Sequence, residues 1–234
     1  MKLFLFDLDG TLVNTGGAGL KALEQTFQTV YGIYDALKDF SCSGKTDPAI
    51  FRQLARTHID KELSSPELEY LQHTYLRYLS INIRYSKNYR VLPGVERFFE
   101  LLMLRGDILL GLGTGNLESG ARIKLTRSNL SPYLPFGGFG SDAEERPEIL
   151  KVGHRRAEAR CGRKIPEKSV FIFGDTRLDI EAAKMAGYQS VAVGTGEFSH
   201  EDLKASGPDY FLPDLTHGPG FLRSLDSVFP PVEA

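Results

Sequence analysis

The chain has 234 residues, of which 41% are hydrophobic and 25% are charged, a composition typical of a folded globular protein rather than a disordered one. Its 28 basic and 30 acidic residues give a formal net charge of -2, so nothing favours nucleic acid or an anionic membrane as a partner. No apolar run approaches the length of a membrane span. The 2 cysteines imply no disulfide framework, and we expect a cytoplasmic protein.

The first apolar run, residues 3–6, is followed by a long stretch that shows helical patterns only. Residues 3–6 are apolar without alternation, as in a strand that is buried on both faces. From about residue 16 to residue 89 apolar side chains recur at helical spacing, and Asp47 and Pro48 resemble the N-cap and first residue of a helix. We therefore expect residues 16–89 to form an all-helical insert, with a natural hinge at Gly16-Gly17.

Strand and helix patterns alternate in the rest of the chain. Apolar runs predict four further strands, at residues 108–112, 170–173, 190–193 and 210–212. Helical patterns separate most of these runs, and Gly187 is placed to end one of the helices. The alternation predicts an α/β fold with a parallel sheet, in which residues 1–15 and 90–234 form the core domain and residues 16–89 a helical domain.

Polar residues follow three of the predicted strands, where the carboxyl ends of parallel strands form ligand sites. The carboxylates are Asp7, Asp9, Asp175 and Asp179, and the hydroxyl is that of Thr114. Carboxylates crowded in one cleft repel each other unless a cation lies between them, and magnesium prefers oxygen ligands. We expect Mg²⁺ to be bound by Asp7, Asp175 and the backbone carbonyl of Asp9, with Asp179 orienting its neighbours.

Three motifs carry a resemblance to a known family. Asp7-Leu8-Asp9-Gly10-Thr11, Thr114-Gly115-Asn116 and Gly174-Asp175-Thr176-x-x-Asp179 resemble three of the four motifs of the haloacid dehalogenase-like hydrolase superfamily, in the same order and at similar spacing. The helical insert resembles the C1 cap of that superfamily. Ser43-Gly44-Lys45-Thr46-Asp47 is similar to the phosphoglycolate phosphatase-like branch. The resemblance covers nearly the whole chain and implies a Rossmann-like three-layer core with an inserted cap.

The resemblance also implies a reaction. Asp7 would attack phosphorus and become an aspartyl-phosphate, while Asp9 would act as general acid and then as general base. Thr114 and the Gly115 amide would hold the remaining phosphoryl oxygens, since glycine lets the backbone approach closely. The implied activity is a magnesium-dependent phosphatase that hydrolyses a small phosphomonoester, either phosphoglycolate-like or a sugar phosphate.

The remaining motif departs from the family pattern, which places a lysine ahead of the Gly174-Asp175 strand end. Here Arg146 precedes a proline that could begin a helix, and its guanidinium would suit phosphoryl oxygens; Lys151 is the alternative. In the cap, Lys45 and Thr46 are the candidates for substrate specificity. Lys124, on the helix after Thr114, is expected to be a surface charge.

Two alternatives stay open at this stage. A β-phosphoglucomutase-like phosphosugar mutase would share every core residue, although its cap usually carries an arginine-containing loop where this chain has Gly44-Lys45-Thr46-Asp47. A non-catalytic protein that binds a phosphorylated ligand would keep the glycines and Thr114 but has no need of Asp9. In each case the expected partner is a small phosphorylated metabolite. The sequence does not indicate an oligomeric state.

Overall fold

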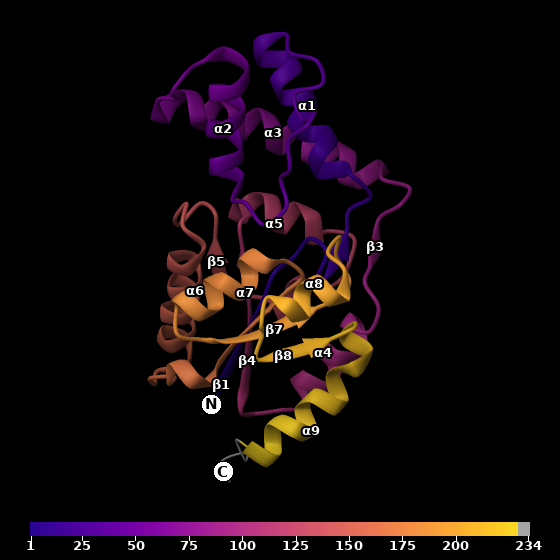
Figure 1. Cartoon of the computed structure of the whole chain (residues 1–234), viewed down its shortest axis with the longest axis vertical. Helices are drawn as coiled ribbons and strands as arrows, with labels where there is room; N and C mark the ends of the chain where they lie inside the picture. Colours follow the sequence, from indigo (N-terminus) through magenta and orange to yellow (C-terminus); the bar gives the residue numbers. More distant parts are fainter. Residues whose placement is uncertain (229–234) are drawn as a thin grey trace.

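The computed structural model describes residues 1–228, which form a six-stranded parallel sheet with helices on both faces and a helical region beyond one end of the strands (Figure 1). The strand order is β5-β4-β1-β6-β7-β8, and each neighbouring pair is parallel. The strands are β1 (Lys2–Phe6), β4 (Ile108–Thr114), β5 (Gly137–Phe139), β6 (Val170–Gly174), β7 (Gln189–Val193) and β8 (Tyr210–Leu212). The predicted α/β fold with a parallel sheet is confirmed.

The two faces of the sheet carry separate hydrophobic clusters, because successive side chains of a strand point to opposite faces. In β1, Phe4 and Phe6 face the layer of α4, α5 and α9, whereas Leu3 and Leu5 face α6 and α7. The helices of the core are α4 (Val95–Met103), α5 (Glu118–Leu125), α6 (Arg146–Cys161), α7 (Arg177–Met185), α8 (His200–Ala205) and α9 (Gly218–Val228). This is a three-layer arrangement with β1 near its centre.

Strand β5 was not predicted, and its sequence explains why. It contains Gly137 and Gly138, and glycine is depleted in strands. A side chain at Gly138 would collide with the Ile149 carbonyl of α6, so glycine permits this helix to pack closely against the sheet edge. A close approach between two elements leaves no periodic signal in the sequence.

The helical region consists of α1 (Ala18–Tyr31), α2 (Asp47–Ile59) and α3 (Ser65–Tyr85), which lie at the top of Figure 1. Among the described residues, no strand occurs between Thr15 and Tyr89. These helices share a hydrophobic cluster, to which Leu117 of the core also belongs. The two chain segments that join them to the core pair with each other as the short antiparallel strands β2 (Val13–Asn14) and β3 (Arg90–Val91).

One predicted helix end was wrong by one residue. The N-cap of α2 is Thr46, whose Oγ1 accepts a hydrogen bond of 3.4 Å from the amide of Ala49, and not Asp47. The Asp47 carboxylate instead turns to the core, where its Oδ2 accepts a hydrogen bond of 2.8 Å from the amide of Leu117. None of the described helices has both the length and the apolar character needed to span a bilayer.

Candidate active site

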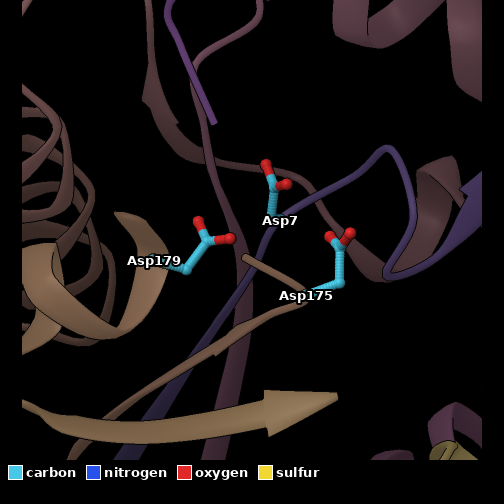
Figure 2. Close-up of side chains that lie close together, drawn as sticks. All are labelled: Asp7, Asp175 and Asp179. Atoms are coloured by element: carbon cyan, nitrogen blue, oxygen red, sulfur yellow. The ribbon is translucent and has the colours of Figure 1, made fainter. Parts of the chain in front are cut away.

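Three buried carboxylates meet at the carboxyl ends of the central strands. Asp7 follows β1, Asp175 follows β6, and Asp179 lies in the first turn of α7. One carboxylate oxygen from each lies within 4.8 Å of the other two, and Figure 2 shows the three side chains converging on one space. The sheet order causes this convergence, because β1 and β6 are direct neighbours.

Hydroxyl groups hold two of these carboxylates in place. Thr11 Oγ1 donates to Asp175 Oδ1 over 3.0 Å. Asp179 Oδ2 accepts from the amide of Thr176 at 3.1 Å and from its hydroxyl at 2.7 Å, which forms a capping box at the start of α7. Asp179 is therefore positioned by the same residue that begins its helix.

Two glycines leave room around Asp175. A side chain at Gly10, which has a φ of 81°, or at Gly196 would collide with the Asp175 carboxylate. Gly196 lies in the loop after β7 and was not among the candidate residues. Its only sequence signal is its position just beyond a predicted strand. The room that these glycines leave is occupied by the Asp175 carboxylate.

The cluster holds more negative charge than the protein neutralises. Burial raises the pKa of Asp7 to about 7, with Asp179 and Asp9 adding to the shift and Arg146 opposing it. Burial also raises the pKa of Asp175 well above its usual range, followed by the effects of Asp179 and Asp7. Three buried carboxylates beside one guanidinium fit a divalent cation in their midst.

Arg146, at the start of α6, is the cation that reaches this cluster. Its guanidinium forms an ion pair with Asp179, and Nη2 lies 3.8 Å from Asp7 Oδ1. Lys151, the alternative, lies one turn further along α6, where it is part-exposed and pairs with Glu148 at 2.7 Å. The structure thus brings Arg146 to the carboxylates and leaves Lys151 on the surface.

Asp9, Thr114 and Asn116 form the opposite wall of the site. Asn116 Nδ2 donates to Thr114 Oγ1 at 2.8 Å and to Asp9 Oδ2 at 3.0 Å. The backbone amide of Asn116 also donates to Thr114 Oγ1, at 3.3 Å. Thr114 is buried at the end of β4, next to β1 in the sheet, which places its hydroxyl beside Asp7.

The expectation that Lys124 is a surface charge was wrong. Its side chain is buried, and Nζ donates to Asp9 Oδ2 and to Asn116 Oδ1, each at 2.5 Å. Burial alone would lower its pKa, but the nearby Asp9, Tyr75 and Asp47 outweigh that effect and raise it. A helical pattern cannot reveal this contact, because the helical region covers the face of α5 that would otherwise meet solvent.

The segment from Gly44 to Asp47, which we call the cap loop, lies directly against the core. Arg146 Nη1 donates to the Gly44 carbonyl at 3.3 Å, and the amide of Asp47 donates to the Gly115 carbonyl at 2.8 Å. A side chain at Gly115 would lie only 2.6 Å from the Lys45 carbonyl. The cap loop and the Gly115 turn are therefore in contact over the site.

The two cap candidates have different surroundings. Lys45 Nζ donates to Gln53 Oε1 at 2.9 Å and lies 4.3 Å from the centre of the Phe40 ring. Thr46 is 2% exposed, and its hydroxyl caps α2. In this arrangement the side chain of neither residue is bonded to the carboxylate cluster.

The chain matches a known protein family. The family model described as "Haloacid dehalogenase-like hydrolase" matches residues 4–193, which include Asp7, Asp9, Thr114, Arg146 and Asp175. The match spans well over half of the chain.

Individual relatives resemble the chain at 29% identity or less. A phosphoglycolate phosphatase of Aquifex aeolicus is 29% identical over 216 residues, covering 91% of this chain and 92% of that protein. The pyrophosphatase PpaX of Halalkalibacterium halodurans is 24% identical over 220 residues, covering 90% and 93%. The crystal structure of CbbY from Rhodobacter sphaeroides in complex with phosphate has a TM-score of 0.72 at 16% identity, over 92% of this chain and 95% of that chain. The structural likeness concerns the fold alone.

Proposed function

The chain belongs to the haloacid dehalogenase-like hydrolase family, and from that premise we propose that it is a magnesium-dependent phosphatase that forms an aspartyl-phosphate on Asp7. The observation that carries the proposal is the buried cluster of Asp7, Asp175 and Asp179, which has Arg146 on one side and Thr114 on the other. The names of the Aquifex and Halalkalibacterium relatives support phosphoryl chemistry. We propose a small phosphorylated metabolite as the substrate.

In the first step, a carboxylate oxygen of Asp7 attacks phosphorus, and the bond from phosphorus to the leaving oxygen breaks. Asp9 donates a proton to that oxygen, so the leaving group departs as an alcohol. Thr114 and the Gly115 amide bind phosphoryl oxygens from one side, and Arg146 binds them from the side of α6.

In the second step, Asp9 accepts a proton from a water molecule, whose oxygen attacks the phosphorus of the aspartyl-phosphate. The bond from phosphorus to the Asp7 oxygen then breaks, which releases inorganic phosphate and restores the carboxylate. Atoms and charge balance over the two steps, and Asp9 ends in its starting protonation state.

Mg²⁺ would be held by Asp7, Asp175 and the backbone carbonyl of Asp9, with Asp179 orienting its neighbours, and when bound it neutralises charge on the phosphoryl oxygens. The protein supplies the geometry that makes this possible. Thr11 and Thr176 fix the directions of Asp175 and Asp179, and Gly10 and Gly196 leave room for the Asp175 carboxylate.

We further propose that residues 16–89 act as a lid on a core formed by residues 1–15 and 90–234. The lid would exclude bulk water while the aspartyl-phosphate forms and admit one water molecule beside Asp9 afterwards. Two observations support this. The joining segments pair as β2 and β3, which gives a narrow connection, and the cap loop contacts the Gly115 turn. Lys45 and Thr46 on that loop are proposed to contribute to specificity.

The test is release of phosphate from a panel of small phosphomonoesters, with Mg²⁺ present and after removal of metal by a chelator. We expect activity only with Mg²⁺, and recovery when Mg²⁺ is returned in excess. Equal activity in both conditions would disprove the metal role. Activity as a mutase on a phosphosugar, without phosphate release, would support the alternative reaction instead.

A further inference from the structure

A second polar cluster lies on the side of Asp9 that faces the helical region. Its central residue is Lys124, whose ammonium donates to Asp9 Oδ2 and to Asn116 Oδ1, each at 2.5 Å. An ammonium group has three N–H donors, and within residues 1–228 no further acceptor is bonded to this one. One donor of a buried lysine therefore remains available beside Asp9.

Tyr75, on α3, supplies a second available donor. Its side chain is 1% exposed, and its ring packs edge-on against Phe51 with 5.6 Å between the centroids. No residue in the described part of the chain hydrogen-bonds to the Tyr75 hydroxyl, yet that part has no fully enclosed polar side-chain atom without a partner. The hydroxyl oxygen is therefore the part of this buried side chain that is not completely enclosed by protein. Burial raises its pKa, so the hydroxyl keeps its proton.

Gly19, on α1, brings the two donors to a common point. A Cβ atom added to Gly19 would lie 3.6 Å from Lys124 Nζ and 3.7 Å from the Tyr75 hydroxyl oxygen. Gly19 does not have a positive φ, and glycine weakens a helix relative to alanine, so backbone conformation does not explain its presence. A Cβ atom there would be in ordinary contact with both groups, so the two donors border a common methyl-sized space beside Gly19.

The donors around this space decide which chemistry it suits. The Lys124 ammonium lies 2.5 Å from Asp9 Oδ2 and keeps one N–H for a further acceptor, and the Tyr75 hydroxyl is a second donor. A hydroxyl oxygen of the substrate can accept from both groups, whether Asp9 still holds the proton for the leaving oxygen or has already donated it.

We propose that Lys124 and Tyr75 form the subsite for the leaving group and select phosphomonoesters that carry a hydroxyl close to the ester oxygen, as polyol and sugar phosphates do. The inference rests on the proposed function, in which Asp9 protonates the leaving oxygen, because groups bonded to Asp9 then border the leaving group. It shifts the main determinant of specificity from Lys45 to a pair that the core helix α5 and the cap helix α3 share.

The test compares three substrates that differ only at the second carbon: ethyl phosphate, 2-hydroxyethyl phosphate and 2-phosphoglycolate. We expect wild-type kcat/KM to favour 2-hydroxyethyl phosphate over ethyl phosphate by about tenfold, as for one neutral hydrogen bond. Tyr75→Phe should reduce that preference to about twofold or less, because the variant lacks the donor for the substrate hydroxyl. The matched control is Tyr78→Phe on the same helix, whose hydroxyl is bonded to Thr29 Oγ1 at 2.7 Å.

Lys124→Met provides a second arm. This variant should lower turnover of all three substrates, because Asp9 loses a partner, and should also reduce the preference for the substrate hydroxyl. The control is Lys151→Met, which replaces a surface lysine and should have neither effect. A preference unchanged by Tyr75→Phe would overturn the subsite. Faster turnover of 2-phosphoglycolate than of 2-hydroxyethyl phosphate would overturn the neutral hydroxyl as its ligand. Turnover of p-nitrophenyl phosphate in the same preparations tests the proposed function separately, and its absence there would overturn both.

Discussion

The core side and the cap side of the candidate active site are built in different ways. On the core side, Asp7 and Thr114 end adjacent parallel strands, and their neighbours in the sheet fix their positions. On the cap side, Lys124, Tyr75 and Lys45 come from two helices and a loop that are brought together only by packing of the helical region on the core. Phosphoryl transfer is therefore assigned to rigid strand ends, and the choice of leaving group to side chains whose positions depend on the cap.

The largest loss of activity should follow the removal of the nucleophile. Asp7→Asn keeps the shape of the side chain but replaces the attacking carboxylate with an amide, so kcat should fall by roughly a thousandfold or more. Steady-state phosphate release measures the loss, and circular dichroism checks the fold. A variant that kept a tenth of wild-type turnover would break the assignment of chemistry to the core side.

Arg146 should have the next largest effect, because it borders both the core carboxylates and the cap loop. Arg146→Ala should raise KM and lower kcat together, by a combined factor of about ten to a thousand, as expected for a charge-assisted contact to phosphate. Lys151→Ala on the same helix is the matched control and should have wild-type kinetics. The reverse result would transfer the phosphate contact to Lys151.

The contact between the Asp47 carboxyl on the cap loop and the Leu117 amide of the core can be tested by the pH dependence of stability. Burial raises its pKa to about 6 from 3.8. Between those pH values the unfolded chain releases a proton that the folded chain keeps, so the free energy of unfolding falls as pH rises through this window. Across the whole window the free energy of unfolding should fall by about 3 kcal/mol at most.

Asp47→Asn keeps an oxygen that can accept from the Leu117 amide but removes the titration. Relative to wild type, the variant should therefore gain stability between pH 4 and pH 7, by up to about 3 kcal/mol in denaturant unfolding. Parallel pH profiles for the two proteins would show that the Asp47 carboxyl is not buried against the core in solution.

Lys45 should have the smallest effect, because its ammonium is bonded to Gln53 and lies over Phe40. Lys45→Ala should lower kcat/KM for a carboxylate-bearing substrate such as 2-phosphoglycolate by about threefold, as for a solvent-exposed charge, and leave p-nitrophenyl phosphate unchanged. Equal effects on both substrates would show that Lys45 does not select for the substrate carboxylate and acts only as a general surface charge.

The same contrast explains what the sequence could reveal. The five predicted strands and the helical insert follow from local apolar patterns, and the cluster at the strand ends follows from the rule that parallel strands end at one edge. Lys124 and Gly196 could not be found in this way. Lys124 is buried and bonded to Asp9, 115 residues away in the sequence, and Gly196 matters because a side chain there would collide with Asp175.

Local patterns also missed short elements. Strand β5 was not predicted because it contains Gly137 and Gly138, which allow α6 to pack closely against it. The start of α2 was predicted one residue late because Asp47 bonds to the core instead of capping its helix. Each miss occurs where tertiary contact, and not local propensity, determines what a residue does.

The central claim is that Asp7 is the residue that carries the phosphoryl group. The most direct measurement is acid quenching of the enzyme during turnover, followed by mass spectrometry to locate a phosphoryl group on the peptide that contains residues 1–9, with Asp7→Asn as the control. The account predicts the added mass on Asp7 in the wild type and none in the variant. A phosphoryl group on a serine or histidine, or the same label in Asp7→Asn, would contradict it.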